Sequence, residues 1–178
     1  MEWKIDQHLT MVQLHETHAP ALFEAVDANR LYLKKWLPWV DGTQNVTDSE
    51  QFIAFTKKQF DTFGVLNFAI LYDGQLAGTI GTHMIQEQNK STSIGYWLCE
   101  SFQGKGIVTT CTYALITYLF EKRRLHRIEI RAAVENDASR RIPERLGFKE
   151  EGIARDSEWL YDHFVDHAVY SILEGEWK

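Results

Sequence analysis

The sequence predicts a single α/β domain of the α+β type, in which a mixed, mostly antiparallel central sheet of about seven strands carries helices on both faces. The dipeptide Asp73-Gly74 joins two short β-prone runs and is typical of a tight antiparallel hairpin. A third β-prone run follows, and then a strand, a helix and a strand, which favours a mixed sheet over a doubly wound parallel one. The chain has no low-complexity run and only three prolines, so residues 1–178 are expected to form one domain without a linker.

The first third of the chain is expected to form a strand followed by helices. Residues 3–14 are strand-like, and residues 18–35 carry apolar side chains spaced for one or two amphipathic helices. Pro38 interrupts that region, because its ring cannot continue a helix. Residues 47–50, Thr-Asp-Ser-Glu, fit a capping box that opens the next helix, and Gly64 is expected to end it. The apolar side of this helix is expected to carry Phe52, Phe55, Phe60 and Phe63.

The remainder of the chain is expected to alternate strands with helices. The further strands are expected at residues 66–72, 76–85, 91–99, 126–134, 148–159 and 164–173. Two helices are expected among them, at residues 106–122 and 138–146, and Gly147 stops the second.

Composition and charge restrict the function. The chain has 178 residues, 44% of them hydrophobic and 25% charged, as in an ordinary globular domain. The formal net charge of −6 opposes binding to nucleic acid and favours a cationic partner such as an amine or a basic peptide. Cys99 and Cys111 lack the spacing of a metal site, so reduced thiols and a cytoplasmic location are expected, with no metal. No apolar run is long enough for a signal peptide or a membrane span, so no membrane partner is expected.

The strongest chemical signal is the turn between the strand at 91–99 and the helix at 106–122. The first N–H groups of a helix have no internal acceptor and carry a partial positive charge, and Gly104 and Gly106 would let a phosphate approach them. The turn lacks the patterns of an ATP-binding or a dinucleotide-binding loop. Taken alone, the two glycines favour a tight connection that binds nothing over a phosphate site.

Several ordered motifs along nearly the whole chain change that balance. They are Trp36-Leu-Pro-Trp39, Gly95-Tyr-Trp-Leu98, Gln103-Gly-Lys-Gly-Ile107, Asn136-Asp-Ala-Ser139, Leu146-Gly-Phe148, and Glu151-Gly152 followed by Tyr170. With these motifs the chain resembles the GNAT acetyltransferase superfamily, and within it the RimJ/RimL branch of ribosomal-protein N-terminal acetyltransferases.

The resemblance implies that acetyl-CoA binds at this turn. Backbone amides of residues 103–108 would hold its pyrophosphate, and main-chain groups of Leu98 and Cys99 would pair with its amide-rich arm as an added strand does. The family pattern has glycine or alanine where this chain has Val108. Lys105, Arg140 and Arg141 are candidates for the phosphate on the adenosine side. The residues expected to contact the cofactor are Leu98, Cys99, Gln103, Gly104, Lys105, Gly106, Ile107, Val108 and Asn136.

Transfer of acetyl to an amine needs a base for the amine and a proton donor for the departing thiolate. By position alone Asn136 and Ser139 are typical of a helix cap, whereas the resemblance implies that Asn136 contacts the cofactor and Ser139 lies near the sulfur as the proton donor. Many relatives use a tyrosine a few residues later, where this chain has Ile142-Pro143. The resemblance implies that Glu158 is the base, which activates the amine through water in RimL-like enzymes, and its alternative is an ordinary solvated carboxylate. The histidines ranked below it are His126, His163 and His167.

The resemblance implies an N-acetyltransferase that moves acetyl from acetyl-CoA directly to a primary amine in a ternary complex. The acceptor expected first is the N-terminal α-amine of a ribosomal protein, and residues 36–45 are the loop expected to select it. The alternatives are a small amine such as a polyamine or an aminoglycoside, and a module that binds acyl-CoA without catalysis. A homodimer or a larger homo-oligomer is also expected from the resemblance.

Overall fold

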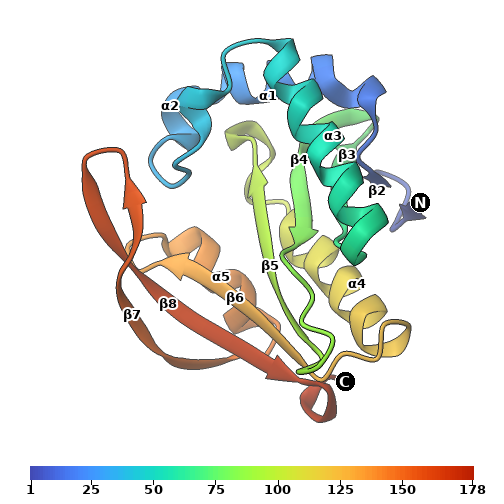
Figure 1. Cartoon of the computed structure of the whole chain (residues 1–178), viewed down its shortest axis with the longest axis vertical. Coiled ribbons are helices and arrows are strands. Elements are labelled where there is room, and N and C mark those ends of the chain that lie inside the picture. The colour runs from blue at the N-terminus through green and yellow to red at the C-terminus, as the bar shows by residue number, and fades with distance from the viewer.

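The computed structural model describes residues 1–178 and has one eight-stranded sheet in the order β1-β2-β3-β4-β5-β6-β8-β7 (Figure 1). The strands are β1 Glu2–Lys4, β2 Leu9–Gln13, β3 Asn67–Tyr72, β4 Gln75–Thr82, β5 Ser91–Leu98, β6 Arg127–Ala133, β7 Lys149–Leu160 and β8 His163–Leu173. The α-helices are α1 Ala19–Ala28, α2 Arg30–Leu33, α3 Val46–Phe63, α4 Ile107–Glu121 and α5 Asp137–Arg145. Every neighbouring pair of strands is antiparallel except β5 with β6. The predicted fold class is therefore confirmed.

The extra strand comes from the N-terminal segment, where residues 3–14 form a hairpin and not one strand. The side chain of Asp6 reverses the chain, because its Oδ1 accepts the N–H groups of His8 at 2.7 Å and of Leu9 at 2.8 Å. An aspartate that bonds its own backbone in this way makes a turn without glycine or proline. The predicted count of seven strands is thus one too low.

The predicted hairpin at Asp73-Gly74 is confirmed. Both residues have positive φ angles, 49° and 77°, and they join β3 to β4. The end of α3 is also as predicted, because Gly64 ends this helix with a φ of 67°.

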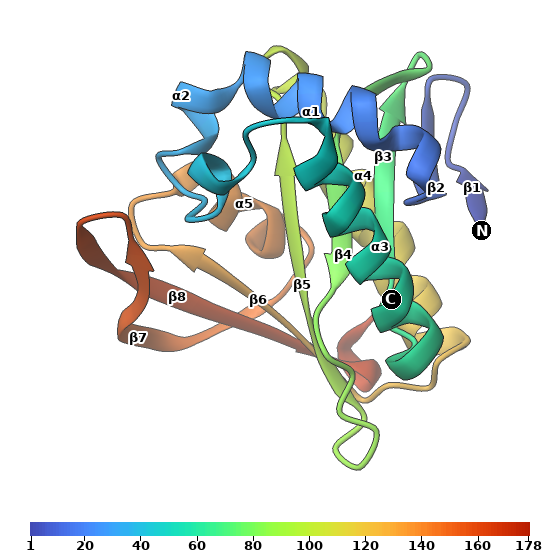
Figure 2. The ribbon, with the colours of Figure 1, turned by 45° about the horizontal axis from the view of Figure 1, so that its top comes forward.

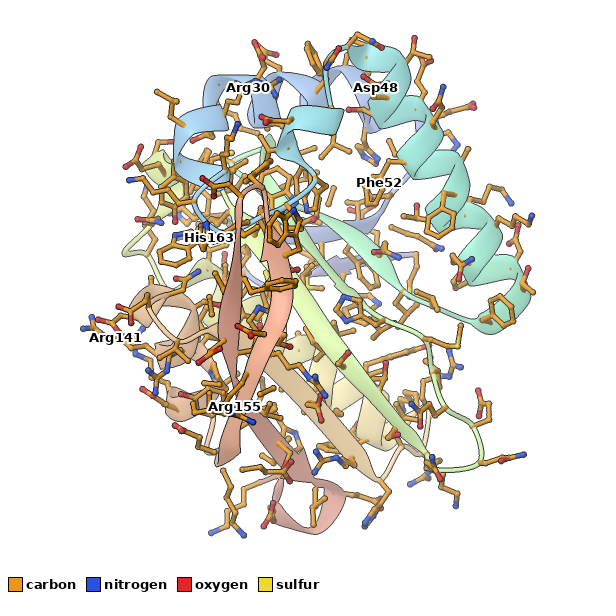
Figure 3. The ribbon with its side chains drawn as sticks, turned by 60° about the vertical axis from the view of Figure 1, so that its left-hand side comes forward. Arg30, Asp48, Phe52, Arg141, Arg155 and His163 are labelled. Carbon is orange, nitrogen blue, oxygen red and sulfur yellow. The ribbon has the colours of Figure 1, made fainter.

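The start and the buried side of α3 differ from the prediction. Asn45 is the cap, and it shares reciprocal side-chain bonds with Asp48 in place of the pair expected at 47 and 50. The buried side of α3 holds Ser49, Ile53 and Thr56, whose spacing of four and three residues forms one helical face. Phe52, near the start of the helix in Figure 3, is 42% exposed, and Phe55 and Phe63 are exposed as well. Only Phe60 of the expected apolar side packs against the main core.

Helices cover the two faces of the sheet unequally (Figures 1 and 2). On one face α4 contributes Ile107, Cys111, Leu115 and Leu119 to the main core, which continues into buried strand side chains. On the other face α1 and α3 pack on a smaller cluster over β3 and β4 and leave β6, β8 and β7 uncovered. That open face is available for a substrate.

The parallel pair β5 and β6 separates partway along its length. Pairing runs only from Ser91 with Arg127 to Ile94 with Ile130, although β5 continues to Leu98 and β6 to Ala133. The two strands therefore diverge and leave unpaired main chain between them, as Figure 1 shows.

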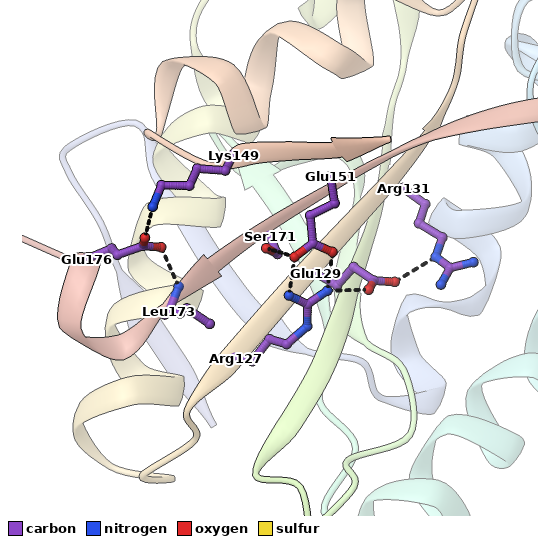
Figure 4. A network of polar contacts seen from close by, with 8 residues as sticks. All are labelled: Arg127, Glu129, Arg131, Lys149, Glu151, Ser171, Leu173 and Glu176. Carbon is purple, nitrogen blue, oxygen red and sulfur yellow. Dashed lines mark hydrogen bonds and ion pairs between the residues drawn. The ribbon is translucent and has the colours of Figure 1, made fainter. Parts of the chain in front are cut away.

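A polar network stabilises the paired end of β6 against β7 and β8 (Figure 4). The guanidinium group of Arg127 donates two bonds of 2.6 Å to Glu151 and one of 2.9 Å to Glu129, and Ser171 donates one of 2.7 Å to Glu151. These donors, Arg127 foremost and then Ser171, lower the pKa of Glu151 to about 2. The motif residue Glu151 is therefore structural.

Replacing Glu151 by glutamine is expected to lower the stability at neutral pH and to flatten its acid dependence. Because the folded state lowers the pKa from 4.5 to about 2, the contribution of Glu151 is complete above about 4.5 and is lost as pH falls toward 2. Urea unfolding at pH 7, 4.5 and 3 measures the difference between the two proteins, which should shrink on acidification. Glu121→Gln, at an exposed site without an ion pair, is the control. A difference that does not change with pH would contradict this account.

Candidate active site

Two cavities lie on opposite sides of the separated strands. The smaller, of about 320 Å³, is bounded by α4, α5 and the turn before α4. The larger, of about 790 Å³, is bounded by α3, the loop after α2 and the open face of the sheet. The residues that line both are Trp36, Leu37, Tyr96, Trp97, Asn136 and Ser139. The cavities therefore meet where β5 and β6 diverge, so groups bound on the two sides can come into contact there.

The turn before α4 presents unused backbone donors to the smaller cavity. Gly104 and Gly106 have φ angles of 74° and 73°, and no atom lies within 4 Å of where a Cβ would stand on either. Gly106 caps α4 without a side-chain bond, and the N–H groups of residues 104–109 donate to no group in the protein. The N–H of Gln103 is used, since it donates to the carbonyl of Glu100 at 3.2 Å. The free donors thus begin at Gly104, one residue later than predicted, and form an anion cradle.

Most of the residues predicted to bind the cofactor come together here, and Cys99 does not. Those that line the smaller cavity are Leu98, Gln103, Gly104, Gly106, Ile107, Val108 and Asn136. Cys99 is buried outside it, with its N–H bonded to Ala77 at 2.7 Å and its carbonyl bonded to Phe102 at 3.1 Å. Its main-chain groups are already paired, which corrects the prediction for Cys99. Because neighbouring residues of a strand point their main-chain groups to opposite sides, those of Leu98 face the gap that β6 leaves.

The basic residues predicted near the adenosine side have different roles. Arg140 donates to Tyr170 at 2.9 Å and to the carbonyl of Val134 at 3.0 Å, so it supports α5 and is not free to bind phosphate. The Nζ of Lys105 lies 4.8 Å from the centre of the Tyr72 ring, outside the cavity. Arg141 does line the smaller cavity, and Arg145, one helical turn later and not foreseen from sequence, lines it too.

Asn136 and Ser139 lie at the junction of the two cavities. The Oδ1 of Asn136 accepts the N–H of Ser139 at 3.2 Å and caps α5, so the capping alternative holds. The Nδ2 of Asn136 has no partner in the protein. Asn136 therefore caps the helix and still offers a donor to both cavities.

Tyr96, from the motif at residues 95–98, brings a hydroxyl group to this junction that the catalytic residues predicted from sequence do not include. Its hydroxyl donates to the carbonyl of Ser139 at 3.1 Å and lies 3.5 Å from Ser139 Oγ. Burial raises the pKa of Tyr96, so its hydroxyl remains protonated at neutral pH. Tyr96 on β5 and Ser139 on α5 are 43 residues apart in the sequence, so no local pattern around Tyr96 indicates this contact.

Glu158 reaches the larger cavity because β7 bulges. Ala154 pairs with His167 and Glu158 with Val165, so β7 has two extra residues between these pairs. The bulge has Asp156 at a φ of 47°, and the N–H of Asp156 donates to Asp166 at 2.8 Å. Bulges of this kind re-aim side chains next to active sites.

Of the three histidines considered from sequence, only His167 lines either cavity. Its Nε2 lies 3.4 Å from Oε2 of Glu158. His163 lies at the tip of the β7–β8 hairpin (Figure 3), paired with Asp162, and His126 lies at the start of β6.

The loop expected at residues 36–45 lines the larger cavity. The guanidinium group of Arg30 fixes this loop by donating hydrogen bonds of 2.8 Å to the carbonyls of Val40 and of Thr43. From the β7–β8 hairpin, the hydroxyl of Tyr161 donates to the carbonyl of Leu37 at 2.7 Å. The loop at residues 36–45 is therefore attached both to α2 and to the β7–β8 hairpin.

Two classes of feature are absent from the structure. No three His, Cys, Asp or Glu side chains gather closely enough to hold a metal ion. No helix is both long and apolar enough to cross a membrane.

The family model described as the acetyltransferase (GNAT) domain matches residues 8–149. The YdaF protein of Bacillus subtilis is 38% identical over 176 residues, which are 98% of this chain and 96% of YdaF. The ribosomal-protein-serine acetyltransferase of Escherichia coli is 29% identical over 168 residues, which are 94% of this chain and 94% of that protein. A structure of the ribosomal L7/L12 α-N-protein acetyltransferase RimL with coenzyme A superposes with a TM-score of 0.93 at 26% identity, covering 97% of this chain and 98% of RimL. With a turn of free amides before α4, a sheet that separates beside it and these relatives, the chain belongs to the GNAT acetyltransferase family.

Proposed function

We propose that this protein acetylates the N-terminal α-amine of a protein, with a ribosomal protein as the acceptor, by direct transfer from acetyl-CoA. The observation that carries the proposal is the meeting of the two cavities at Tyr96, Asn136 and Ser139. A donor on one side of the sheet and an acceptor on the other would come together there. The names of the RimL enzyme and of the E. coli relative support the choice of a ribosomal acceptor.

The smaller cavity fits acetyl-CoA, which supplies the activated acetyl group and leaves as a thiol. The free N–H groups from Gly104 onward suit the pyrophosphate, because their cradle has open space where side chains would otherwise stand. The unpaired main chain of Leu98 suits the amides of the pantetheine arm. Arg141 and Arg145 suit the phosphate on the adenosine side.

The chemical groups at the junction suit a transfer without a covalent enzyme intermediate. Glu158 faces the acceptor side and is assigned as the base, while Tyr96 and Ser139 are assigned as proton donors to the departing thiolate. Neither cysteine is available as a nucleophile, because burial raises the pKa of Cys99 to about 11 and that of Cys111 to about 12. The acceptor amine therefore attacks the thioester directly.

The charges of the larger cavity favour an acceptor with one positive charge over a polycation. Its charged residues apart from histidine are Asp48, Arg131 and Glu158. The carboxylate of Asp48 already accepts two N–H groups, from Gln44 at 2.8 Å and from Asn45 at 3.0 Å. Arg131 is paired with Glu129 at 2.6 Å, so Glu158 is the one carboxylate of this cavity that backbone N–H groups do not engage. A single carboxylate suits a single ammonium group, whereas a polyamine or an aminoglycoside would need several carboxylates.

Release of free thiol from acetyl-CoA, measured with a panel of acceptors, tests the proposal. Peptides with free N-termini should be acetylated, their α-acetylated counterparts should not react, and spermidine and an aminoglycoside should be poorer acceptors. Mass spectrometry of the peptide products locates the acetyl group. Turnover of the polyamine alone would replace the proposed acceptor, and acetyl-CoA binding without turnover of any acceptor would indicate a binding module.

A pair of glycine variants provides the control for the cofactor site in this experiment. Gly106→Trp and Gly74→Trp both place a side chain at a positive φ in open space, so they impose similar backbone strain. Only Gly106 belongs to the proposed cradle, so calorimetry should show that acetyl-CoA affinity is lost in Gly106→Trp and retained in Gly74→Trp.

A further inference from the structure

The partner of Glu158 is a histidine that has no other assigned role. His167 comes from β8 and its side chain is only 15% exposed, whereas that of Glu158 is 34% exposed. Their Nε2 and Oε2 atoms are 3.4 Å apart, and both residues line the acceptor cavity. Neither side chain makes a hydrogen bond in the structure, and this contact is the only ion pair of either residue.

The bulge in β7 creates this pair. Without its two extra residues, the register that places Ala154 opposite His167 would place position 156 opposite Val165. With them, Glu158 takes the place opposite Val165 and becomes the diagonal neighbour of His167 on the same face. Asp166, the residue before His167, holds the bulge through the N–H of Asp156 at 2.8 Å. Two adjacent residues of β8 thus position the pair: Asp166 holds the bulge, and His167 contacts the carboxylate of Glu158.

We propose that Glu158 and His167 form a proton relay for the acceptor amine, which rests on the proposed function. The ammonium group of the acceptor gives one proton to Glu158, and the same proton passes from Oε2 of Glu158 to Nε2 of His167. The amine is left neutral with its lone pair free, Glu158 is again a carboxylate, and His167 becomes an imidazolium ion that later releases the proton to water. His167 acts through Glu158 and is a positioning residue in this scheme.

The surroundings suit a transient positive charge on His167. The other titratable or charged groups that line the same cavity are Arg131 from β6, Asp48 from α3, His83 after β4 and Tyr96 from β5. The carboxylate of Glu158, 3.4 Å away, stabilises the imidazolium ion, while Arg131 and His83 add no negative charge that would retain it. The carboxylate of Asp48 is occupied by backbone N–H groups. The relay can therefore reset after each turnover.

Replacement of His167 by glutamine and by phenylalanine tests the relay. Glutamine keeps a hydrogen-bond donor for Glu158 but cannot take up the proton, and phenylalanine keeps a ring without a donor. At neutral pH both variants should lower kcat for a peptide acceptor by at least about tenfold. This loss is smaller than the about 10²- to 10⁴-fold that removal of a general base usually costs, because Glu158 is still present. Acetyl-CoA affinity by calorimetry should stay unchanged. His163→Gln, in the exposed pair with Asp162, is the matched control and should keep the wild-type rate.

The pH dependence separates a relay from a structural role. An α-amine is largely neutral above about pH 8 to 9 and then needs no base. The loss of kcat in His167→Gln relative to the wild-type protein should therefore shrink at least several-fold between pH 7 and pH 9. A loss of kcat caused by a defect in structure would persist at pH 9. A wild-type rate and pH profile in His167→Gln, or a deficit that pH 9 does not reduce, would overturn the relay. Absence of turnover in the wild-type protein would instead contradict the proposed function.

Discussion

Replacement of Glu158 by glutamine is expected to lower kcat for a peptide acceptor by about 10²- to 10⁴-fold, the usual cost of losing a general base. Glutamine fits the same space on the bulge of β7, but it cannot accept the proton of the ammonium group. The loss of rate should be largest at neutral pH and shrink toward pH 9, because an α-amine that is already neutral needs no base. Thiol release across the pH range measures both effects.

Acetyl-CoA affinity should be unchanged in Glu158→Gln, since the carboxylate lines only the acceptor cavity. Glu174→Gln, at an exposed position whose side chain has no partner, is the control for the loss of one negative charge. If Glu158→Gln kept the wild-type rate and pH profile, Glu158 would be an ordinary solvated carboxylate. His167, or water held by main-chain carbonyls, would then be the remaining base.

Removal of the hydroxyl groups of Tyr96 and Ser139 is expected to lower kcat with little effect on acetyl-CoA affinity. The two oxygens are 3.5 Å apart at the junction, so both can deliver a proton to the same departing thiolate. Tyr96→Phe keeps the buried ring, and Ser139→Ala keeps the backbone N–H that Asn136 caps. The larger single loss should reach about 10²- to 10⁴-fold if that residue is the general acid.

The double variant shows whether the two hydroxyls serve one step. Groups that act as a unit have non-additive effects, so the double variant should lose little more than the worse single variant. Tyr113→Phe, at an exposed site on α4, controls for loss of a phenol. Full activity in both single variants would mean that the thiolate takes its proton from water.

Local backbone chemistry explains most of what could be predicted about the fold. The turn at Asp73-Gly74 and the helix end at Gly64 depend on positive φ angles that few residues adopt, so a short stretch of sequence indicates them. The start of α3 was misplaced because Asn45 with Asp48 and the later pair of polar residues satisfy the same short pattern. The hairpin at Asp6 was missed because one aspartate makes it, without the usual turn residues.

The burial of α3 shows where periodicity alone fails. Four phenylalanines predicted an apolar side, but the face that packs on the sheet holds Ser49, Ile53 and Thr56. A helix buries the side that its neighbours meet, and α3 packs through Ile53 on α1 and on Ala69 of β3, which leaves Phe52 and Phe55 exposed. The rings of Phe52 and Phe55 line the larger cavity, so the helix face that periodicity mispredicted lies at the candidate site.

The sequence by itself determined the fold class, the family and the place of the glycine-bearing turn before α4, because short motifs of neighbouring residues indicate each of them. The two glycines before a helix were sufficient to indicate unused N–H groups. Only the tertiary structure decided which groups meet at the reacting centre. Tyr96 reaches Ser139 across 43 residues, and Glu158 reaches His167 only because β7 has a bulge between them. Such contacts depend on strand register and on where β5 and β6 separate, which the packing of the whole chain sets and no local pattern records.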